Sequence, residues 1–283
     1  MLRTPCAAIH PGPADMWGRG RITPRELTVD LGLRGSTVLV TGAGQGLGRS
    51  LGLAFAAEGA DVAFHYRTSG AGAEKAAREA VTRGVRSIAV GADLRDRDQI
   101  ARALDQVESA LGPVTILVNN SAVTQNKPFL ETSEDDWEAQ IGVTVTGTIR
   151  MVRHVVERMV SNGGGGSIVT LMGDSGRVGE SRLLVTATAR SSTVGLTKSV
   201  AKEFARHGIR ANAVSIALVR TDSFESHAGG ADDERMKKVL TQYPLRRLGT
   251  PEDVTPMVLL LASPLSSWTT GQVISVNGGY AMP

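Results

Sequence analysis

The chain has little cysteine, no long apolar run and no large excess of charge. Its single cysteine, Cys6, cannot form an intrachain disulfide and suits a reducing compartment, so we expect a cytoplasmic protein. The best apolar run, Val258 to Ala262, is too short to cross a bilayer, and residues 1–35 lack the continuous apolar core of a secretion signal. The net charge of +3 is too small to indicate nucleic-acid binding. We therefore expect neither a membrane nor a nucleic acid as a partner.

Glycine, by contrast, is abundant, and three glycines form a motif. Thr37 to Val40 is apolar or β-branched, as in a strand buried on both faces of a parallel sheet. Gly42, Gly46 and Gly48 follow directly, and residues 49–57 then have the apolar spacing of a helix. A glycine turn between a strand and a helix lets the backbone approach a pyrophosphate, which the helix N-terminus attracts. The stretch therefore predicts a dinucleotide site.

From Ser36 onward, apolar strands alternate with amphipathic helices, which is typical of a doubly wound parallel sheet. The expected strands are Thr37–Thr41, Asp61–Tyr66, Ser87–Gly91, Ile116–Asn119, Ser167–Met172, Arg210–Ser215 and Val273–Val276. The expected helices span residues 46–58, 71–83, 96–110, 134–161, 187–207 and 251–262. We predict an α/β fold of the Rossmann type, with a seven-stranded parallel sheet and helices on both faces. It forms a single domain over residues 36–283, after an N-terminal arm, 1–35, that is flexible or lies on a neighbouring subunit.

Residues 223–245 interrupt this alternation. They contain Phe224 and His227 and then a charged stretch from Asp232 to Tyr243 with scattered apolar residues. A long segment after a strand's carboxyl end is where α/β folds place ligand lids. A solvated surface helix explains the pattern equally well, so both interpretations stay open.

Several motifs resemble the short-chain dehydrogenase/reductase family in order and spacing, over residues 36–280. The matching segments are Thr41–Gly48, which fits that family's TGxxxGxG, Ala92–Leu94, Asn119–Ala122, Pro244–Asp253 and Val276–Gly279. The resemblance implies a Rossmann fold and a nicotinamide cofactor. The cofactor-binding positions that it implies are Gly42, Gln45, Gly46, Leu47, Gly48, Asp93, Leu94, Asn120, Ser121, Val219 and Thr221.

The end of the second strand bears on which nicotinamide cofactor is used. NAD-preferring relatives place a carboxylate there, which bonds the ribose 2′-hydroxyl. This chain has Tyr66, Arg67, Thr68 and Ser69 instead. Arg67 can pair with a 2′-phosphate, and the neighbouring hydroxyls can donate to it. We therefore predict NADP(H), with Tyr66, Arg67 and Thr68 as contacts; the alternative is that Arg67 is an ordinary surface cation.

Members of the resembled family use an Asn–Ser–Tyr–Lys set, and all four residues differ here. Thr186 stands at the Tyr position, Arg190 at the Lys, Gly173 at the Ser and Thr144 at the Asn. A threonine hydroxyl is far less acidic than a phenol, whose pKa starts near ~10, and arginine stays protonated. We therefore expect no enzyme proton donor at these catalytic positions. Arg190 is expected to hold the nicotinamide ribose, and Gly173 to open space beside the nicotinamide.

A cofactor site without a proton donor suggests a substrate that brings its own acid. A ketone beside a phenol, as in aromatic polyketides, carries an internal hydrogen bond, and that phenol or a water could release the proton. The missing set resembles the atypical ketoreductases that act on angucyclinone-type polyketides. The expected partner is therefore a small-molecule ketone of this kind, and no metal site is expected. The expected pocket residues are Asp174, Ser175, Leu183 and Phe224, with Val178, Leu184 and Met236 as further candidates.

Two alternatives stay open. The chain could bind NADP(H) without turnover, as a pseudoenzyme or scaffold. It could also act as a dehydratase or isomerase without net redox change, with Asp174 or His227 as a base.

The helices expected over 134–161 and 187–207 carry apolar residues on more than one face. These are Val143, Val145, Ile149, Val152, Val155, Val156, Val194, Leu196 and Val200. Members of the resembled family pair through these two helices, so we expect a homodimer or homotetramer.

Overall fold

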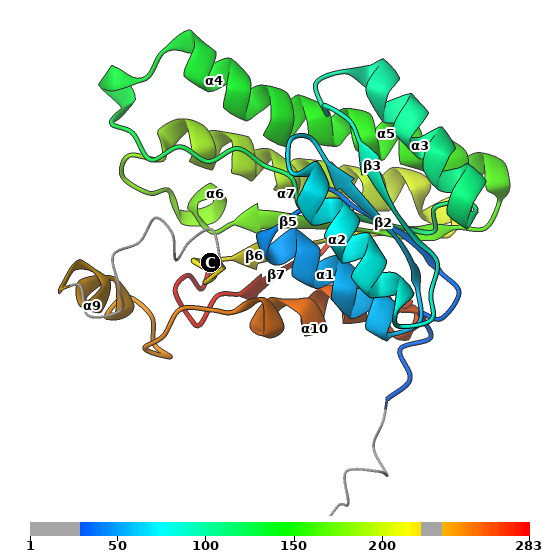
Figure 1. Cartoon of the computed structure of the whole chain (residues 1–283). Helices are drawn as coiled ribbons and strands as arrows, with labels where there is room; N and C mark the ends of the chain where they lie inside the picture. The colour runs from blue at the N-terminus through cyan, green and yellow to red at the C-terminus, as the bar shows by residue number, and fades with distance from the viewer. Residues whose placement is uncertain (1–28, 222–233) are drawn as a thin grey trace, which may run out of the picture. The chain divides into compact units, whose positions relative to one another are not determined.

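The seven strands form one parallel sheet in the order β3-β2-β1-β4-β5-β6-β7 (Figure 1). The computed structural model describes residues 29–221 and 234–283. The strands are β1 (Thr37–Val40), β2 (Asp61–Tyr66), β3 (Ser87–Gly91), β4 (Ile116–Asn119), β5 (Gly166–Gly173), β6 (Ile209–Ile216) and β7 (Val273–Val276). The order reverses where β1 lies beside β4, with Val38 opposite Ile116. The predicted Rossmann-type fold is confirmed, and this reversal is where such folds bind their ligands.

Helices cover both faces of the sheet (Figure 1). Alternate strand residues face opposite cores, so Val38 and Val40 belong to one and Leu39 to the other. The first core includes α1 (Gly46–Ala57), α2 (Gly70–Val81) and α10 (Pro251–Ala262), and the second α3 (Arg97–Leu111), α5 (Thr148–Asn162) and α7 (Leu184–Phe204). The shorter helices are α4 (Glu134–Ile141), α6 (Ser175–Val178), α9 (Glu234–Leu240), η1 (Phe129–Glu131), η3 (Ala205–His207) and η4 (Pro264–Ser266).

The single helix expected over 134–161 is divided into three parts. A π-helical segment, η2 (Gly142–Gly147), separates α4 from α5. A Cβ on Gly147 would lie 2.8 Å from the Leu94 Cβ, so the missing side chain allows the close approach. Apolar periodicity does not reveal such a contact. In addition, α7 begins at Leu184, three residues before the expected start at 187.

The compact unit begins at Leu31, before the predicted boundary at Ser36. Leu33 is 1% exposed, and the Leu31 carbonyl accepts a hydrogen bond from Ser263 Oγ at 2.6 Å. Residues 31–35 thus pack with the domain, whereas residues 1–28 lie outside the described residues. The segment 223–245 is described only from residue 234, where α9 begins, so the lid and the surface helix both stay predictions.

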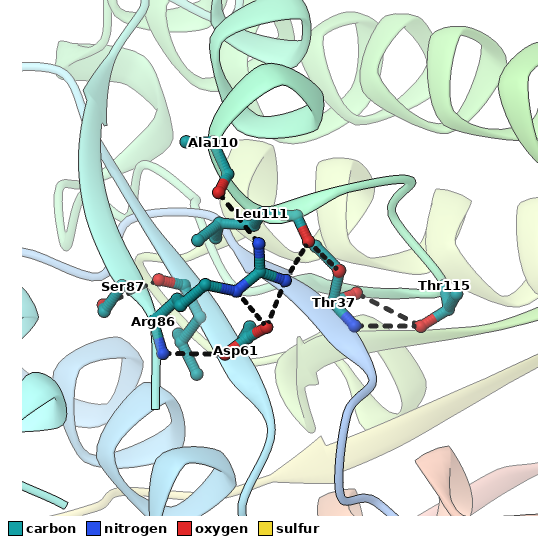
Figure 2. A network of polar contacts seen from close by, with 8 residues as sticks. Thr37, Asp61, Arg86, Ser87, Ala110, Leu111 and Thr115 are labelled. Atoms are coloured by element: carbon teal, nitrogen blue, oxygen red, sulfur yellow. Dashed lines mark hydrogen bonds and ion pairs between the residues drawn. The ribbon is translucent and has the colours of Figure 1, made fainter. Parts of the chain in front are cut away.

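A polar network links the amino ends of three strands to the end of α3 (Figure 2). Arg86 Nε and Nη2 donate to Asp61 Oδ2 at 2.9 and 2.6 Å. The same guanidinium donates to two carbonyls at the end of α3, Ala110 O at 3.1 Å and Leu111 O at 2.6 Å. Thr37 Oγ1 also donates to Leu111 O, at 3.1 Å. The network therefore joins the C-terminus of α3 to β1, β2 and β3, at the edge of the sheet opposite the glycine-rich turn.

Candidate active site

The glycine-rich turn after β1 has the geometry of a pyrophosphate cradle. Gly42 and Gly46 have φ angles of 64° and 54°, a region that favours glycine. A Cβ on Gly48 would lie 2.3 Å from Gly42 O and 2.5 Å from Asn120 Nδ2, so no side chain fits there. Gln45, the N-cap residue of α1, makes no side-chain capping bond, and the first turn of the helix contains no acidic residue. The positive end of the helix is therefore left for an anion.

Two polar side chains, half-buried Asn120 and buried His65, hold this turn in place. Asn120 Nδ2 donates to Thr41 O at 3.0 Å and to Gly42 O at 3.1 Å. His65 Nδ1 accepts from Gly42 N at 3.2 Å, which assigns the ring proton to Nε2, 3.1 Å from Ala92 O. Burial lowers the pKa of His65 to about 4, so the ring is neutral at physiological pH. Sequence reasoning did not select His65, although a histidine inside an otherwise apolar strand was a usable signal.

A groove of about 560 Å³ runs past the turn along the carboxyl ends of the strands. Every predicted cofactor residue except Tyr66 lines it, namely Gly42, Gln45, Gly46, Leu47, Gly48, Arg67, Thr68, Asp93, Leu94, Asn120, Ser121, Arg190, Val219 and Thr221. The structure places Tyr66 elsewhere. A Cβ on Gly70 or Gly91 would lie 3.0 or 3.1 Å from the Tyr66 ring, so that ring packs between the two glycines.

At the end of β2 the groove carries an exposed cation, Arg67, which forms no ion pair within residues 29–221 and 234–283. The carboxylate nearest in the groove, Asp93, is instead bound by Arg95, whose Nη2 lies 2.6 Å from Asp93 Oδ2. The Arg95 hydrogen bonds hold the pKa of Asp93 at about 2. Arg67 is thus left available for an added negative charge such as a 2′-phosphate. The groove as a whole fits a nicotinamide dinucleotide of the NAD(P) type.

A second cavity, of about 420 Å³, adjoins the groove. The two share a wall made of Thr124, Arg190, Ile216, Ala217 and Leu218. Of the predicted pocket residues, Asp174, Ser175 and Leu183 line this cavity, together with Gly173 and Thr186. Val178, Leu184 and Met236 are not among its lining residues, and Phe224 and His227 lie outside the described residues. The cavity therefore offers room for a second ligand beside the groove.

The hydroxyl of Thr186 is 2% exposed and fully engaged. It accepts from Gln125 N at 3.2 Å and donates to Gln140 Oε1 at 2.5 Å. The orientation of the Gln140 amide is fixed because its Nε2 donates to the Asp136 carbonyl at 3.1 Å, and a carbonyl can only accept. Gln140 Oε1 is therefore an acceptor, and it takes the one proton of Thr186. That proton points away from any ligand in the cavity.

Arg190 lies on the second turn of α7 and is partly buried. Within the described residues its side chain makes one hydrogen bond, from Nη2 to Thr124 Oγ1 at 3.3 Å, and it pairs with no carboxylate there. Burial lowers the pKa of Arg190 to about 10, which still leaves it positively charged at neutral pH. A guanidinium has five N–H donors. Arg190 can therefore offer most of them to ligands in the groove and in the cavity.

The two other positions of the expected catalytic set differ in placement. Gly173 faces the cavity, and a Cβ added to it would meet Ser175 Oγ at 3.5 Å and Arg190 Nε at 3.9 Å, both ordinary contact distances. Thr144 lies in the π-helical segment and lines neither cavity; its Oγ1 accepts from Val123 N at 3.1 Å. Thr144 thus fixes the loop after β4 rather than facing a ligand.

Asp174 is 1% exposed and bound by neutral donors. Ser215 Oγ donates to Oδ1, and Asn277 Nδ2 donates to Oδ2 at 2.6 Å. Among the cavity residues that sequence reasoning missed are three with ionisable side chains, Glu180, Tyr243 and Tyr280. Burial raises the pKa of Glu180 and, together with the charge of Glu180, raises that of Tyr280 to about 12. Residues 243 and 280 lie far apart in the sequence, so only the fold brings them together.

Two features are absent from residues 29–221 and 234–283. No helix there is long and apolar enough to span a bilayer. No group of three or more His, Cys, Asp or Glu side chains in this part of the chain could hold a metal ion.

Comparison with known proteins adds four findings. Residues 42–281 match the family model described as enoyl-(acyl carrier protein) reductase. The chain is 34% identical over 246 residues to 3-oxoacyl-(acyl-carrier-protein) reductase FabG of Staphylococcus aureus, covering 87% of this chain and 98% of the relative. It is also 34% identical over 261 residues to (3R)-3-hydroxyacyl-CoA dehydrogenase of Mus musculus, covering 89% and 98%. Among solved structures, a short-chain type dehydrogenase/reductase from Mycobacterium marinum superposes with a TM-score of 0.81 at 30% identity, covering 89% of this chain and 98% of that one.

Proposed function

The chain belongs to the short-chain dehydrogenase/reductase family, and we propose that it is an NADPH-dependent ketoreductase that draws its proton from the substrate. The substrate class that fits is a ketone hydrogen-bonded to a neighbouring phenol, as in aromatic polyketides. The relatives support ketone chemistry, because one is named for a 3-oxoacyl substrate and another for a 3-hydroxyacyl substrate. The narrowest form of the proposal is an angucyclinone-type substrate, such as that of simocyclinone biosynthesis.

The observation that carries the proposal is the direction of the Thr186 proton. Thr186 donates its proton to Gln140 Oε1 and not to a ligand, and we assign Arg190 to ligand binding and not to proton transfer. A substrate with an internal phenol needs no such donor, because its own proton is already placed at the carbonyl oxygen. The enzyme then contributes position and orientation, which can be worth several kcal/mol.

The residues of the groove have separate tasks. Gly42, Gly46 and the N-terminus of α1 would hold the pyrophosphate, and Arg67 the 2′-phosphate. Arg190 would hold the nicotinamide ribose from the wall shared with the substrate cavity. When bound, the cofactor supplies the hydride for the carbonyl carbon.

We also propose a homodimer or homotetramer. Of the apolar residues expected on α5, Val152, Val155 and Val156 pack inside the chain's own core, and Ile149 is exposed.

The test is consumption of NADPH with a 1-hydroxyaryl ketone, followed at the cofactor's near-ultraviolet absorbance and by the mass of the product. We expect a product with two added hydrogen atoms and a faster reaction with NADPH than with NADH. The methyl ether of the same phenol should react about 10²–10⁴-fold more slowly, the usual effect of losing a general acid.

Other results would reject the proposal. Equal rates for the phenol and its methyl ether would place the proton source on the protein. An altered product without NADPH consumption would indicate the dehydratase or isomerase alternative. Cofactor binding with no change in any substrate would indicate a pseudoenzyme.

A further inference from the structure

The substrate cavity has an uneven distribution of charge. Its charged lining residues within the described part of the chain are Asp174, Glu180 and Arg190. Asp174 is bound by Ser215 and Asn277, as described above. The groups that act on Glu180 are Tyr280 and Asp174, and Arg190 is not among them. The guanidinium is thus the single positive side chain of this lining, and no carboxylate of the described residues neutralises it.

A partly buried charge without a partner is costly, and a ligand of opposite charge offsets that cost. Arg190 borders the cavity beside Gly173, where a Cβ would lie at an ordinary contact distance of 3.9 Å from Arg190 Nε. Within the described residues the guanidinium makes one hydrogen bond, at 3.3 Å to Thr124 Oγ1. The remaining donors of the planar fork are available to a planar acceptor with two oxygens.

We propose that Arg190 binds the phenolic oxygen of the substrate and stabilises the negative charge that this oxygen acquires when its proton passes to the ketone oxygen, as the hydride reaches the carbonyl carbon; the phenol later regains a proton from water. This inference rests on the proposed function. The phenolic and ketone oxygens of such a substrate lie close together in one plane, where a guanidinium can bind both. Arg190 then selects hydroxyaryl ketones over simple ketones and orients the oxygen-bearing edge toward the cofactor groove, away from Asp174 and Glu180.

The experiment uses 1-hydroxyanthraquinone, whose absorption shifts to longer wavelength on ionisation, bound to the full chain with NADP⁺. Because the cofactor is already oxidised, no reduction takes place. Absorbance against pH gives the phenol's apparent pKa in the complex. We expect the wild-type protein to lower that pKa by at least one unit relative to water, a tenfold or greater preference for the anion. Arg190→Met should abolish the preference, and Arg190→Lys should retain part of it.

Two controls separate this site from the cofactor site and from general charge effects. Arg177→Met removes a nearby cation of α6 that bonds Ser275 and does not line the cavity, and it should leave the shift unchanged. Affinity for NADP⁺ is measured for each variant, since a role limited to the ribose would weaken NADP⁺ without changing the phenol's pKa.

The inference is overturned if the wild-type protein causes no shift, or if Arg190→Met causes the same shift as wild type. A shift that depends on Arg190 supports it even if NADPH is never consumed, in which case only the proposed reductase activity fails.

Discussion

Two arginines at opposite edges of the sheet show how differently the fold treats its charges. Arg86, at the amino ends, uses its guanidinium on Asp61 and on the last carbonyls of α3 (Figure 2). Arg190, at the carboxyl ends, makes one hydrogen bond within the described residues, at 3.3 Å to Thr124 Oγ1. The carboxylates follow the same division: Asp61 pairs with a cation, whereas Asp174 accepts from the neutral donors Ser215 and Asn277. The guanidinium of Arg86 is therefore bonded within the protein, whereas that of Arg190 has N–H donors left for a ligand.

The difference follows from the topology of a doubly wound sheet. Loops after the strands meet at the carboxyl edge, where the order of β1 and β4 reverses and a crevice forms. Charged side chains at the carboxyl ends of the strands can bind ligands, while those at the amino ends hold the helix ends to the strands. We therefore expect substitutions at the amino edge to change stability alone. Substitutions at the carboxyl edge should change ligand binding, unless the residue holds the protein's own loops.

The largest expected effect concerns His65, which supports the glycine-rich turn. Its pKa in the folded protein is about 4, against 6.5 for an unperturbed histidine, so the folded state favours the neutral ring. The stability this provides is present above pH 6.5 and is lost as the pH falls toward 4. The shift corresponds to about 3 kcal/mol of unfolding free energy.

Urea unfolding at a series of pH values measures this loss. His65→Gln is the matched variant, since its amide can both accept from Gly42 N and donate to Ala92 O. Wild type should lose about 3 kcal/mol more than the variant between pH 7 and pH 4. Parallel curves for the two proteins would show that the ring does not titrate as the structure implies.

A smaller effect is expected at the other edge. Arg86→Ala removes the charge partner of Asp61, whose side chain is 13% exposed, and the donors to Ala110 and Leu111. Because the Arg86 side chain is itself 61% exposed, solvent screens the pair, and we expect a loss of about 1–2 kcal/mol. NADPH affinity should not change.

Thermal unfolding and cofactor titration of the same samples test this expectation. Arg153→Ala breaks an exposed pair with Glu157 and should cost less than about 0.5 kcal/mol. A fall in NADPH affinity for Arg86→Ala, at unchanged stability, would contradict the division between the two edges.

The sequence predicted the fold and the groove well, because both depend on local patterns. The apolar strands and the glycine turn are contiguous in sequence, and the predicted strand boundaries match within one residue. The π-helical segment was missed because apolar spacing does not distinguish a π-helical turn from the α-helical turns on either side of it. The orientation of the Thr186 hydroxyl was also beyond the sequence, since Gln125 and Gln140 reach it from separate segments. Tyr66 was misplaced because strand alternation does not show that its ring packs against Gly70 and Gly91.

The smallest expected effect on catalysis is that of Thr186, and it distinguishes a structural hydroxyl from a catalytic one. Thr186→Ala leaves Gln125 N and Gln140 Oε1 without their partner, so the protein should lose about 1–3 kcal/mol of stability. Thr186→Ser keeps the hydroxyl and should restore most of that loss. Turnover of a hydroxyaryl ketone by folded Thr186→Ala should stay within about tenfold of wild type, a barrier change of roughly 1.4 kcal/mol.

Turnover is measured at a temperature where both variants are folded, so that a loss of stability is not mistaken for a loss of catalysis. A general acid would cost about 10²–10⁴-fold when removed, so the two expectations barely overlap. If Thr186→Ala were folded but inactive and Thr186→Ser active, the hydroxyl would have to reorient toward the cavity during the reaction. Its hydrogen bond to Gln140 would then be a resting arrangement, and the carboxyl edge would supply the proton after all.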